Sequence, residues 1–99
     1  MVKRVFNGFQ IIQDLIKLRW VPEIIKSISI GNSRYSEILD SIPHMSHTEL
    51  NRKLAVLLKK GVLVRTTKDN TINYSLQKFG EELMHIFLHL EDLELKYFE

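Results

Sequence analysis

Cysteine is absent from the 99 residues of this sequence, and glycine (four residues) and proline (two residues) are scarce. Without cysteine the chain has no disulfide bond, no thiol redox sensor and no zinc site with cysteine ligands. No glycine-rich phosphate loop, Ser-His-Asp arrangement or pair of carboxylates in a cleft can be identified. These absences leave little room for an enzyme active site.

Long apolar runs are absent as well. No run is long enough to span a bilayer, and the basic start of the chain is followed by Asn7 and Gly8 rather than by the apolar core of a signal peptide. We therefore expect a cytoplasmic protein without membrane contact. The composition (44% hydrophobic, 26% charged) is typical of a globular protein, and residues 1–99 are predicted to form one domain. A chain this short buries a modest fraction of its surface, so a core shared with a second copy would stabilise it.

The net charge is only +2, but the charges are unevenly distributed. Residues 46–68 hold one acid, Glu49, against six cations: Arg52, Lys53, Lys59, Lys60, Arg65 and Lys68. Residues 81–99 hold one base, Lys96, against six acids. This asymmetry predicts that the middle of the chain meets an anionic partner.

Residues 46–61 are predicted to form the central helix. Ser46 and Glu49 have the spacing of a capping box, and Gly61 suits the left-handed residue that ends a helix. One face is apolar (Leu50, Leu54, Leu57 and Leu58), and the opposite face is polar and basic (His47, Thr48, Asn51, Arg52 and Lys53). A rod of this kind, about 22 Å long, fits the major groove of DNA. The alternative is the solvated face of an ordinary helix.

Two further helices are expected before it. Residues 5–18 carry one apolar stripe at Val5, Phe9, Ile12 and Ile16 and another at Ile11, Leu15 and Leu18. Two stripes predict burial on two sides, one against the core and one against a second subunit. Residues 20–30 form the next helix, with Pro22 in its first turn, Gly31 at its end and Trp20 as a core anchor.

The segment before the central helix completes a helix-turn-helix over residues 34–60. Arg34 and Tyr35 are predicted to form a short strand, Ser36 to cap a helix over residues 37–41, and Pro43 to stop it. Residues 62–76 change to the alternating period of strands, and the segment 68–71 supplies turn residues for a hairpin. A hairpin after a helix-turn-helix is a wing.

Residues 77–99 are predicted to form a last helix that is too apolar to stand alone in water. A membrane-surface helix is the competing interpretation, but its acidic polar face would be repelled by anionic lipids. We expect it to pack with the first helix across a two-fold axis. The predicted dimer contacts on these two helices, residues 1–18 and 77–99, are Phe9, Ile12, Ile16, Phe87, Leu90, Leu93 and Tyr97.

Several motifs in register resemble the HxlR family, which is related to the MarR-type winged-helix regulators. They are Arg19-Trp20, Arg34-Tyr35-Ser36-Glu37-Ile38, Met45-Ser46 with Leu50, Leu54 and Leu57, Gly61-Val62-Leu63-Val64-Arg65, and Tyr74-Ser75-Leu76-Gln77-Lys78-Phe79-Gly80. The resemblance implies an α+β, mostly α, winged helix-turn-helix and a homodimeric transcription regulator. The family often has glycine where His44 stands, and its wings are often longer and contain proline. Its sensor members use a cysteine near the N-terminus, so a thiol switch is not carried over.

Metal binding is the main chemical alternative. His85 and His89 are four residues apart on one helix face, and Glu81, Glu82 or Asp92 could add an oxygen ligand. No third close ligand or recognised spacing is evident, so we predict no metal site and no cofactor.

The hypothesis is therefore a sequence-specific DNA-binding regulator, most simply a repressor of a pseudo-palindromic operator. The predicted DNA contacts are His47, Thr48, Asn51 and Arg52 at base edges, Tyr35, Ser36, Lys53, Lys59, Arg65 and Lys68 at phosphates, and Ser46 and Asn70 beside them. The alternative is a winged-helix module that docks an acidic protein partner. A small-molecule effector in an apolar cavity near the terminal helices is compatible with the sequence, which does not identify it.

Overall fold

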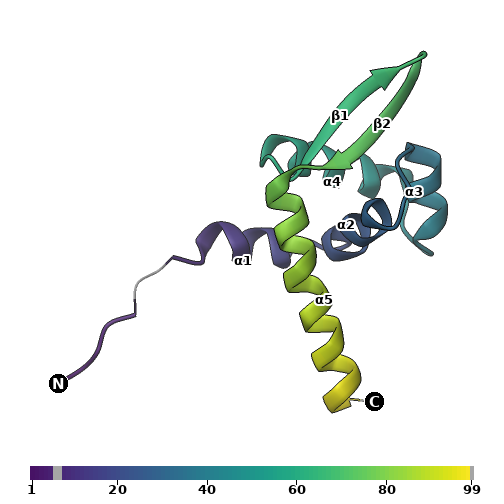
Figure 1. Ribbon diagram of the computed structural model, residues 1–99. Coiled ribbons are helices and arrows are strands. Elements are labelled where there is room, and N and C mark those ends of the chain that lie inside the picture. The colour runs from purple at the N-terminus through teal and green to yellow at the C-terminus, as the bar shows by residue number, and fades with distance from the viewer. Residues whose placement is uncertain (6–7, 99) are drawn as a thin grey trace.

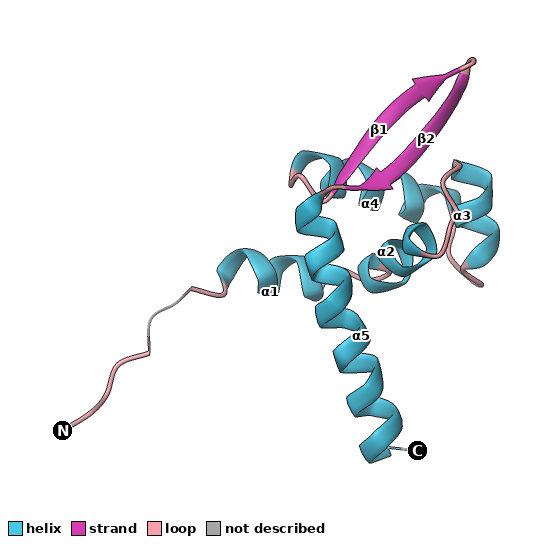
Figure 2. Cartoon of the chain, viewed as in Figure 1, coloured by secondary structure: helices cyan, strands magenta, loops and turns pink. Residues whose placement is uncertain are grey.

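The computed structural model describes residues 1–5 and 8–98, and within them the chain forms five helices and one antiparallel hairpin (Figures 1 and 2). The order is α1 (Gln10–Ile16), α2 (Val21–Ser29), α3 (Tyr35–Ser41), α4 (His47–Lys59), β1 (Leu63–Lys68), β2 (Thr71–Leu76) and α5 (Lys78–Phe98). This is the predicted winged helix-turn-helix with helices at both ends. Glu99, the predicted last residue of the final helix, lies outside the described residues.

The core lies between α2, α3, α4, the base of the hairpin and the first half of α5. Its fully buried side chains are Leu15, Val21, Ile24, Ile25, Ile38, Leu50, Leu57, Val62, Leu63 and Leu83. Helices α2 and α4 supply five of them. Trp20 is half-buried against this core, as expected.

The hairpin forms as the turn residues predicted. The strands pair from Leu63 opposite Leu76 to Lys68 opposite Thr71. Asp69 and Asn70 have φ values of 52° and 62°, the two positive values of a type I′ turn. Ile72, an apolar residue of β2, is 38% exposed. The outer half of the hairpin extends beyond the helices and has no layer to pack against (Figure 1).

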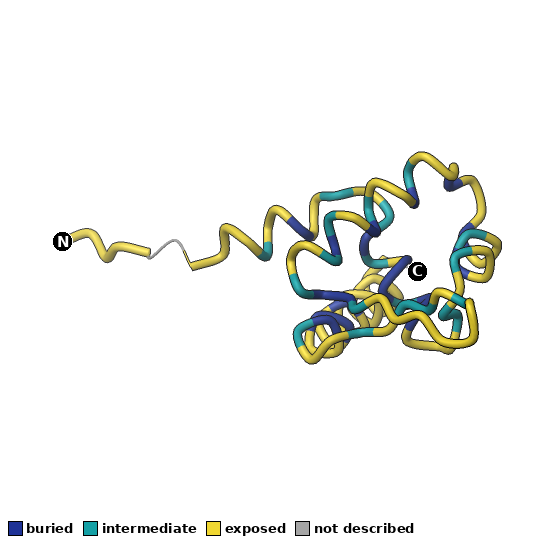
Figure 3. Tube along the Cα trace, turned by 90° about the horizontal axis from the view of Figure 1, so that it is seen from above, coloured by how far each residue is buried: buried dark blue, intermediate teal, exposed yellow. Residues whose placement is uncertain are grey.

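The first helix is shorter than predicted. It begins at Gln10 rather than Val5: Met1–Val5 are exposed and have no regular structure, and Phe6 and Asn7 lie outside the described residues. Leu15 is buried and Ile12 and Leu18 pack partly on the core, whereas Phe9 and Ile11 are more than half exposed. Helices in proteins are stabilised mainly by tertiary packing, which a single chain does not supply to residues 1–5, 8 and 9, all of them exposed (Figure 3).

The strand predicted at Arg34 and Tyr35 is also wrong. Tyr35 is the first residue of α3, and Arg34 is its extended N-cap. Glu37 Oε1 accepts hydrogen bonds from the backbone N–H groups of Arg34 (3.1 Å) and Ser33 (3.2 Å). The helix is therefore capped from Glu37 and starts two residues earlier than a cap at Ser36 would allow. Ser33 O instead accepts one bond, 2.7 Å long, from Tyr74 N of β2.

The ends of the chain project from the folded centre. The radius of gyration is 15.3 Å, compared with about 13 Å for a compact domain of this length. No residue of α5 after Phe87 is buried, and α1 and the N-terminal extension leave the core in another direction (Figures 1 and 3).

Candidate nucleic-acid interface

The ends of α4 are held as the sequence predicted. Ser46 Oγ accepts a hydrogen bond from Glu49 N (3.1 Å), and Ser46 N donates to Glu49 Oε1 (3.0 Å). At the other end Gly61 has a φ of 76°. Leu50, Leu54 and Leu57 are buried, which fixes the rotation of the helix about its axis.

The second oxygen of Glu49 makes a contact that the sequence pattern did not predict. Trp20 Nε1 donates a hydrogen bond to Glu49 Oε2 over 2.7 Å, across 29 residues of sequence. The bond from Ser46 N, followed by the bond from Trp20, lowers the pKa of Glu49 from its usual 4.5. Arg19 stacks on the Trp20 ring with its guanidinium carbon 4.6 Å from the ring centroid. The start of α4 is thereby attached to the start of α2.

The face of α4 opposite the core presents the predicted base-reading residues. His47, Thr48, Asn51 and Arg52 are all exposed, whereas Lys53 is half-buried at the flank. The sequence interpretation missed Ala55, which is exposed between Arg52 and Lys59. Alanine occurs on both buried and exposed helix faces, so the sequence pattern does not assign Ala55 to the polar face. Its exposure is seen only in the folded chain. Donors, an acceptor and a small apolar side chain together suit the edges of bases in a major groove.

The side chain of Tyr35 in α3 reaches the first turn of α4. Tyr35 Oη donates to the carbonyl O of His47 (3.2 Å) and also lies 3.3 Å from His47 Nδ1. Tyr35 is one of the predicted phosphate contacts. In the folded chain its hydroxyl is hydrogen-bonded to His47. Ser36, the next predicted phosphate contact, is exposed, whereas Ser46 Oγ is bound in the α4 cap.

A small polar network fixes α3 against α2. The Ser27 and Ser41 hydroxyl oxygens are 2.6 Å apart, Ser41 Oγ donates to Ile38 O (2.7 Å), and Asn32 Nδ2 donates to Ser27 Oγ (3.1 Å). Because Ser41 gives its proton to Ile38, Ser27 is the donor between the two hydroxyls. The network satisfies the one buried polar side chain among the described residues, Ser27.

The hairpin presents the remaining predicted contacts. Arg65, Lys68 and Asn70 are exposed along it. The middle of β2 is held to the turn before α3, where Ser33 Oγ donates to Asn73 Oδ1 over 3.1 Å. Helix α4 and the hairpin are therefore attached to one scaffold, with their cations outward.

The second candidate feature is the apolar surface on α1 and α5. Of the predicted dimer contacts, Phe9, Ile16, Leu90, Leu93 and Tyr97 are 37–67% exposed. Ile12 is half-buried, and Phe87 already belongs to the core of the single chain, which leaves less of either side chain for a partner. Ile86 joins the exposed set, so positions 86, 90, 93 and 97 form a stripe with coiled-coil spacing.

A groove of about 400 Å³ lies beside this stripe. Its lining includes Ile16, Met84, Phe87 and Leu90, and its rim carries the ion pair between Lys26 Nζ and Glu91 Oε2 (2.7 Å). The volume falls in the range of small-ligand pockets, but the lining overlaps the predicted dimer face.

Residues 1–5 and 8–98 contain neither a helix that could span a membrane nor a group of side chains that could hold a metal ion. No helix in this part of the chain is both long and apolar enough to cross a membrane. No three His, Asp or Glu side chains there are grouped so that they could hold a metal ion.

The comparison with known proteins gives one consistent family. The sequence profile described as HxlR-like helix-turn-helix matches residues 15–99. YvaP, an uncharacterized HTH-type transcriptional regulator of Bacillus subtilis, is 34% identical over 76 residues, which are 74% of this chain and 70% of YvaP. YdeP of the same organism is 28% identical over 87 residues, which are 85% of this chain and 68% of YdeP. The reduced form of the B. subtilis transcriptional regulator YodB has the same fold, with a TM-score of 0.82 and 22% identity over 97% of each chain.

Proposed function

Because the chain belongs to the HxlR-like helix-turn-helix family of transcriptional regulators, we propose that it acts as a homodimer which binds a specific duplex sequence through α4. The observation that carries the proposal is the exposed polar strip on α4, formed by His47, Thr48, Asn51 and Arg52. The strip lies on a helix that is capped at both ends and held by three buried leucines. A rigid helix with base-reading side chains is what direct readout in the major groove requires.

The cations around the strip support contacts to the DNA backbone. Lys53 and Lys59 lie on α4 beside the polar strip, and Arg65 and Lys68 lie on the hairpin. Such contacts position a protein on the duplex and strengthen binding at low salt, but they carry no direct sequence information.

The apolar stripe on α5 supports the dimer. Leu90, Leu93 and Tyr97 lie among the last eleven residues of α5 and are all at least 37% exposed. Packing within a single chain therefore adds little stability to this half of the helix. In a dimer, the α5 stripes of the two copies would pack against each other and against α1. This packing would bury the exposed apolar side chains of both α1 and α5. Two α4 helices related by a two-fold axis would read a pseudo-palindrome whose half-sites are about 34 Å apart. A dimer on such an operator would repress transcription by obstructing polymerase.

The experiment that tests the proposal is a selection followed by a titration. Genomic fragments are selected on the purified protein, and the most enriched duplex is titrated against a scrambled duplex from low to physiological salt. Specific affinity about a thousand-fold or more above non-specific affinity is expected, with binding that weakens steeply as salt rises. Equal affinity for both duplexes would contradict sequence-specific binding. Absence of binding at low salt would contradict the DNA-binding role and favour an acidic protein partner.

A further inference from the structure

The hydroxyl of Tyr35 lies between two polar groups of His47. Its oxygen is 3.2 Å from the His47 carbonyl O and 3.3 Å from His47 Nδ1. The two rings are stacked with their centroids 5.8 Å apart and their planes inclined by 16°. One residue at the start of α3 therefore holds both the backbone and the ring of the first residue of α4.

The number of protons on the two side chains determines which atom donates in each bond. The phenol has a single proton, and a carbonyl oxygen can only accept, so both contacts are hydrogen bonds only when Tyr35 donates its proton to the His47 carbonyl. The contact between Tyr35 Oη and His47 Nδ1 is then a hydrogen bond only if Nδ1 donates. A neutral imidazole carries one proton, so the other nitrogen, Nε2, is left as an acceptor.

We propose that Tyr35 is a positioning residue that holds His47 in the Nδ1–H tautomer, so that Nε2 accepts a hydrogen bond from the amino group of an adenine or a cytosine. The assignment rests on the proposed function, because it treats His47 as a base-reading residue. His47 is exposed and opens α4, and the first residues of a recognition helix are those that reach base edges.

The donor and acceptor pattern of the major groove makes this assignment selective. Adenine N6 and cytosine N4 are its only amino donors, whereas guanine O6, guanine N7 and thymine O4 are acceptors. Phosphate oxygens are acceptors too. A neutral His47 whose Nε2 has no proton cannot donate to any of these groups, so it is excluded from phosphate, guanine and thymine contacts and restricted to an amino-bearing base.

The tautomer is tested without DNA. Histidine-labelled protein is examined by nitrogen-15 NMR at about pH 8.5, roughly two units above the ordinary histidine pKa, with His47 identified by its absence from the His47→Ala variant. We expect the proton on Nδ1 in the wild type. In Tyr35→Phe, which keeps the stacked ring and loses the hydroxyl, His47 should change to a mixture of tautomers while His44, His85 and His89 stay the same. A wild-type His47 with its proton on Nε2 would overturn the inference and leave the proposed DNA binding intact.

The base contact is tested on the selected duplex with single-atom probes. Each adenine is replaced in turn by purine, and each cytosine by pyrimidin-2-one, so that only the amino group is lost. At one position in each half-site the wild type should bind about two- to tenfold more weakly, the range of a single hydrogen bond. The His47→Ala variant should show no such loss there, and Tyr35→Phe a smaller loss than the wild type.

Loss of an amino group also weakens the base pair itself. Because His47→Ala is titrated against the same altered duplex, any effect of the weakened base pair on affinity is common to both proteins and cancels in the comparison. If the wild type and His47→Ala lose affinity equally at every position, His47 does not read an amino group. A protein that binds no duplex selectively would overturn the proposed function and the base-reading role together, and the NMR result would still decide the tautomer.

Discussion

Trp20 Nε1 donates a 2.7 Å hydrogen bond to Glu49 Oε2, and so joins the residue before α2 to the first turn of α4. The same carboxylate closes the capping box through its other oxygen, which is bonded to Ser46 N. One side chain therefore closes the cap of α4 and links the first turn of α4 to the start of α2.

The first prediction concerns the pH dependence of this contact. The bonds from Ser46 N and Trp20 lower the pKa of Glu49 in the folded chain below its usual 4.5. The ionised carboxylate therefore stabilises the fold at any pH above 4.5, and this contribution is lost as the pH falls through the lowered pKa. Between about pH 6 and pH 3 the wild-type Tm should fall more than that of Glu49→Gln. Thermal unfolding by circular dichroism measures both, with the exposed Glu82→Gln as control. Parallel curves for wild type and Glu49→Gln would contradict the linkage.

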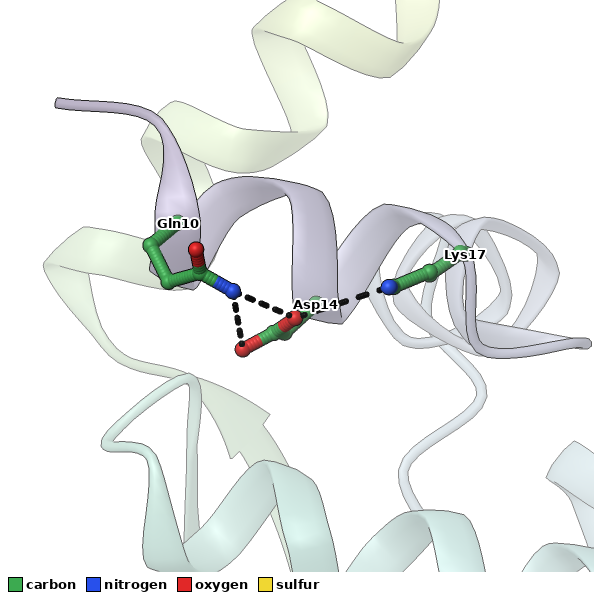
Figure 4. A network of polar contacts seen from close by, with 3 residues as sticks. All are labelled: Gln10, Asp14 and Lys17. Atoms are coloured by element: carbon green, nitrogen blue, oxygen red, sulfur yellow. Dashed lines mark hydrogen bonds and ion pairs between the residues drawn. The ribbon is translucent and has the colours of Figure 1, made fainter. Parts of the chain in front are cut away.

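The second prediction assigns Arg52 to a base. Arg52→Ala should weaken binding to the selected duplex by about 1–3 kcal/mol and affect the scrambled duplex much less. The control is Lys17→Ala, which removes a cation from the exposed polar face of α1, where Lys17 pairs with Asp14 at 3.8 Å and Asp14 also accepts from Gln10 (Figure 4). Equal weakening on both duplexes would show that Arg52 contacts phosphate only.

The third prediction concerns the hairpin. Lys68 is exposed next to the turn, where a phosphate contact would release counterions. Lys68→Ala should reduce the slope of log affinity against log salt concentration by about 1. Fluorescence anisotropy at four or five salt concentrations measures this slope, again with Lys17→Ala as control. An unchanged slope would remove the hairpin from the DNA contacts.

The fourth prediction tests the dimer face. Sedimentation equilibrium of the wild type should give twice the chain mass of 11.7 kDa. Leu93→Asp should give one chain mass, because packing of two α5 stripes against each other would bury the new charge without a partner. Ile72→Asp is the matched control: Ile72 is 38% exposed and Leu93 37%, but Ile72 lies on the hairpin. A dimeric Leu93→Asp variant would place the interface elsewhere.

The fifth prediction concerns Gly80 in the first turn of α5. A Cβ at this position would collide with the carbonyl O of Val62 and would lie 3.2 Å from Leu76 Cδ2. Because a backbone atom cannot yield as a side chain can, Gly80→Ala should destabilise the chain by about 1–3 kcal/mol. Urea unfolding measures the change. Gly8→Ala, which meets nothing within 4 Å, is the control. Equal stability of both variants would contradict the close approach of α5 to Val62.

The start of α3 differs from the one that the sequence predicts. Ser36 has the chemistry of an N-cap, yet the chain uses Glu37, whose carboxylate reaches back to two backbone N–H groups. Both arrangements are locally acceptable. Helix α3 begins at Tyr35 because Ser33 is held at the edge of β2 by Tyr74 N, a contact across 41 residues that no local pattern contains.

The amino-acid sequence by itself determined the features that depend on neighbouring residues. The Ser46–Glu49 cap, the left-handed Gly61, the Asp69–Asn70 turn and the period change from α4 to the hairpin all involve groups within a few residues of one another, and the structure has each of them. The helix-turn-helix and its polar outer face followed, because the buried leucines set the orientation of α4.

Only the tertiary structure decided the features that join distant segments. The bonds from Trp20 to Glu49 and from Tyr35 to His47, and the close approach of Gly80 to Val62, depend on how whole helices lie relative to one another. So does the division of the α1 stripes, in which Leu15 is buried while its neighbour Ile16 stays exposed. A residue's type limits the bonds it can form, but packing of the core determines which distant group comes within hydrogen-bond distance of it.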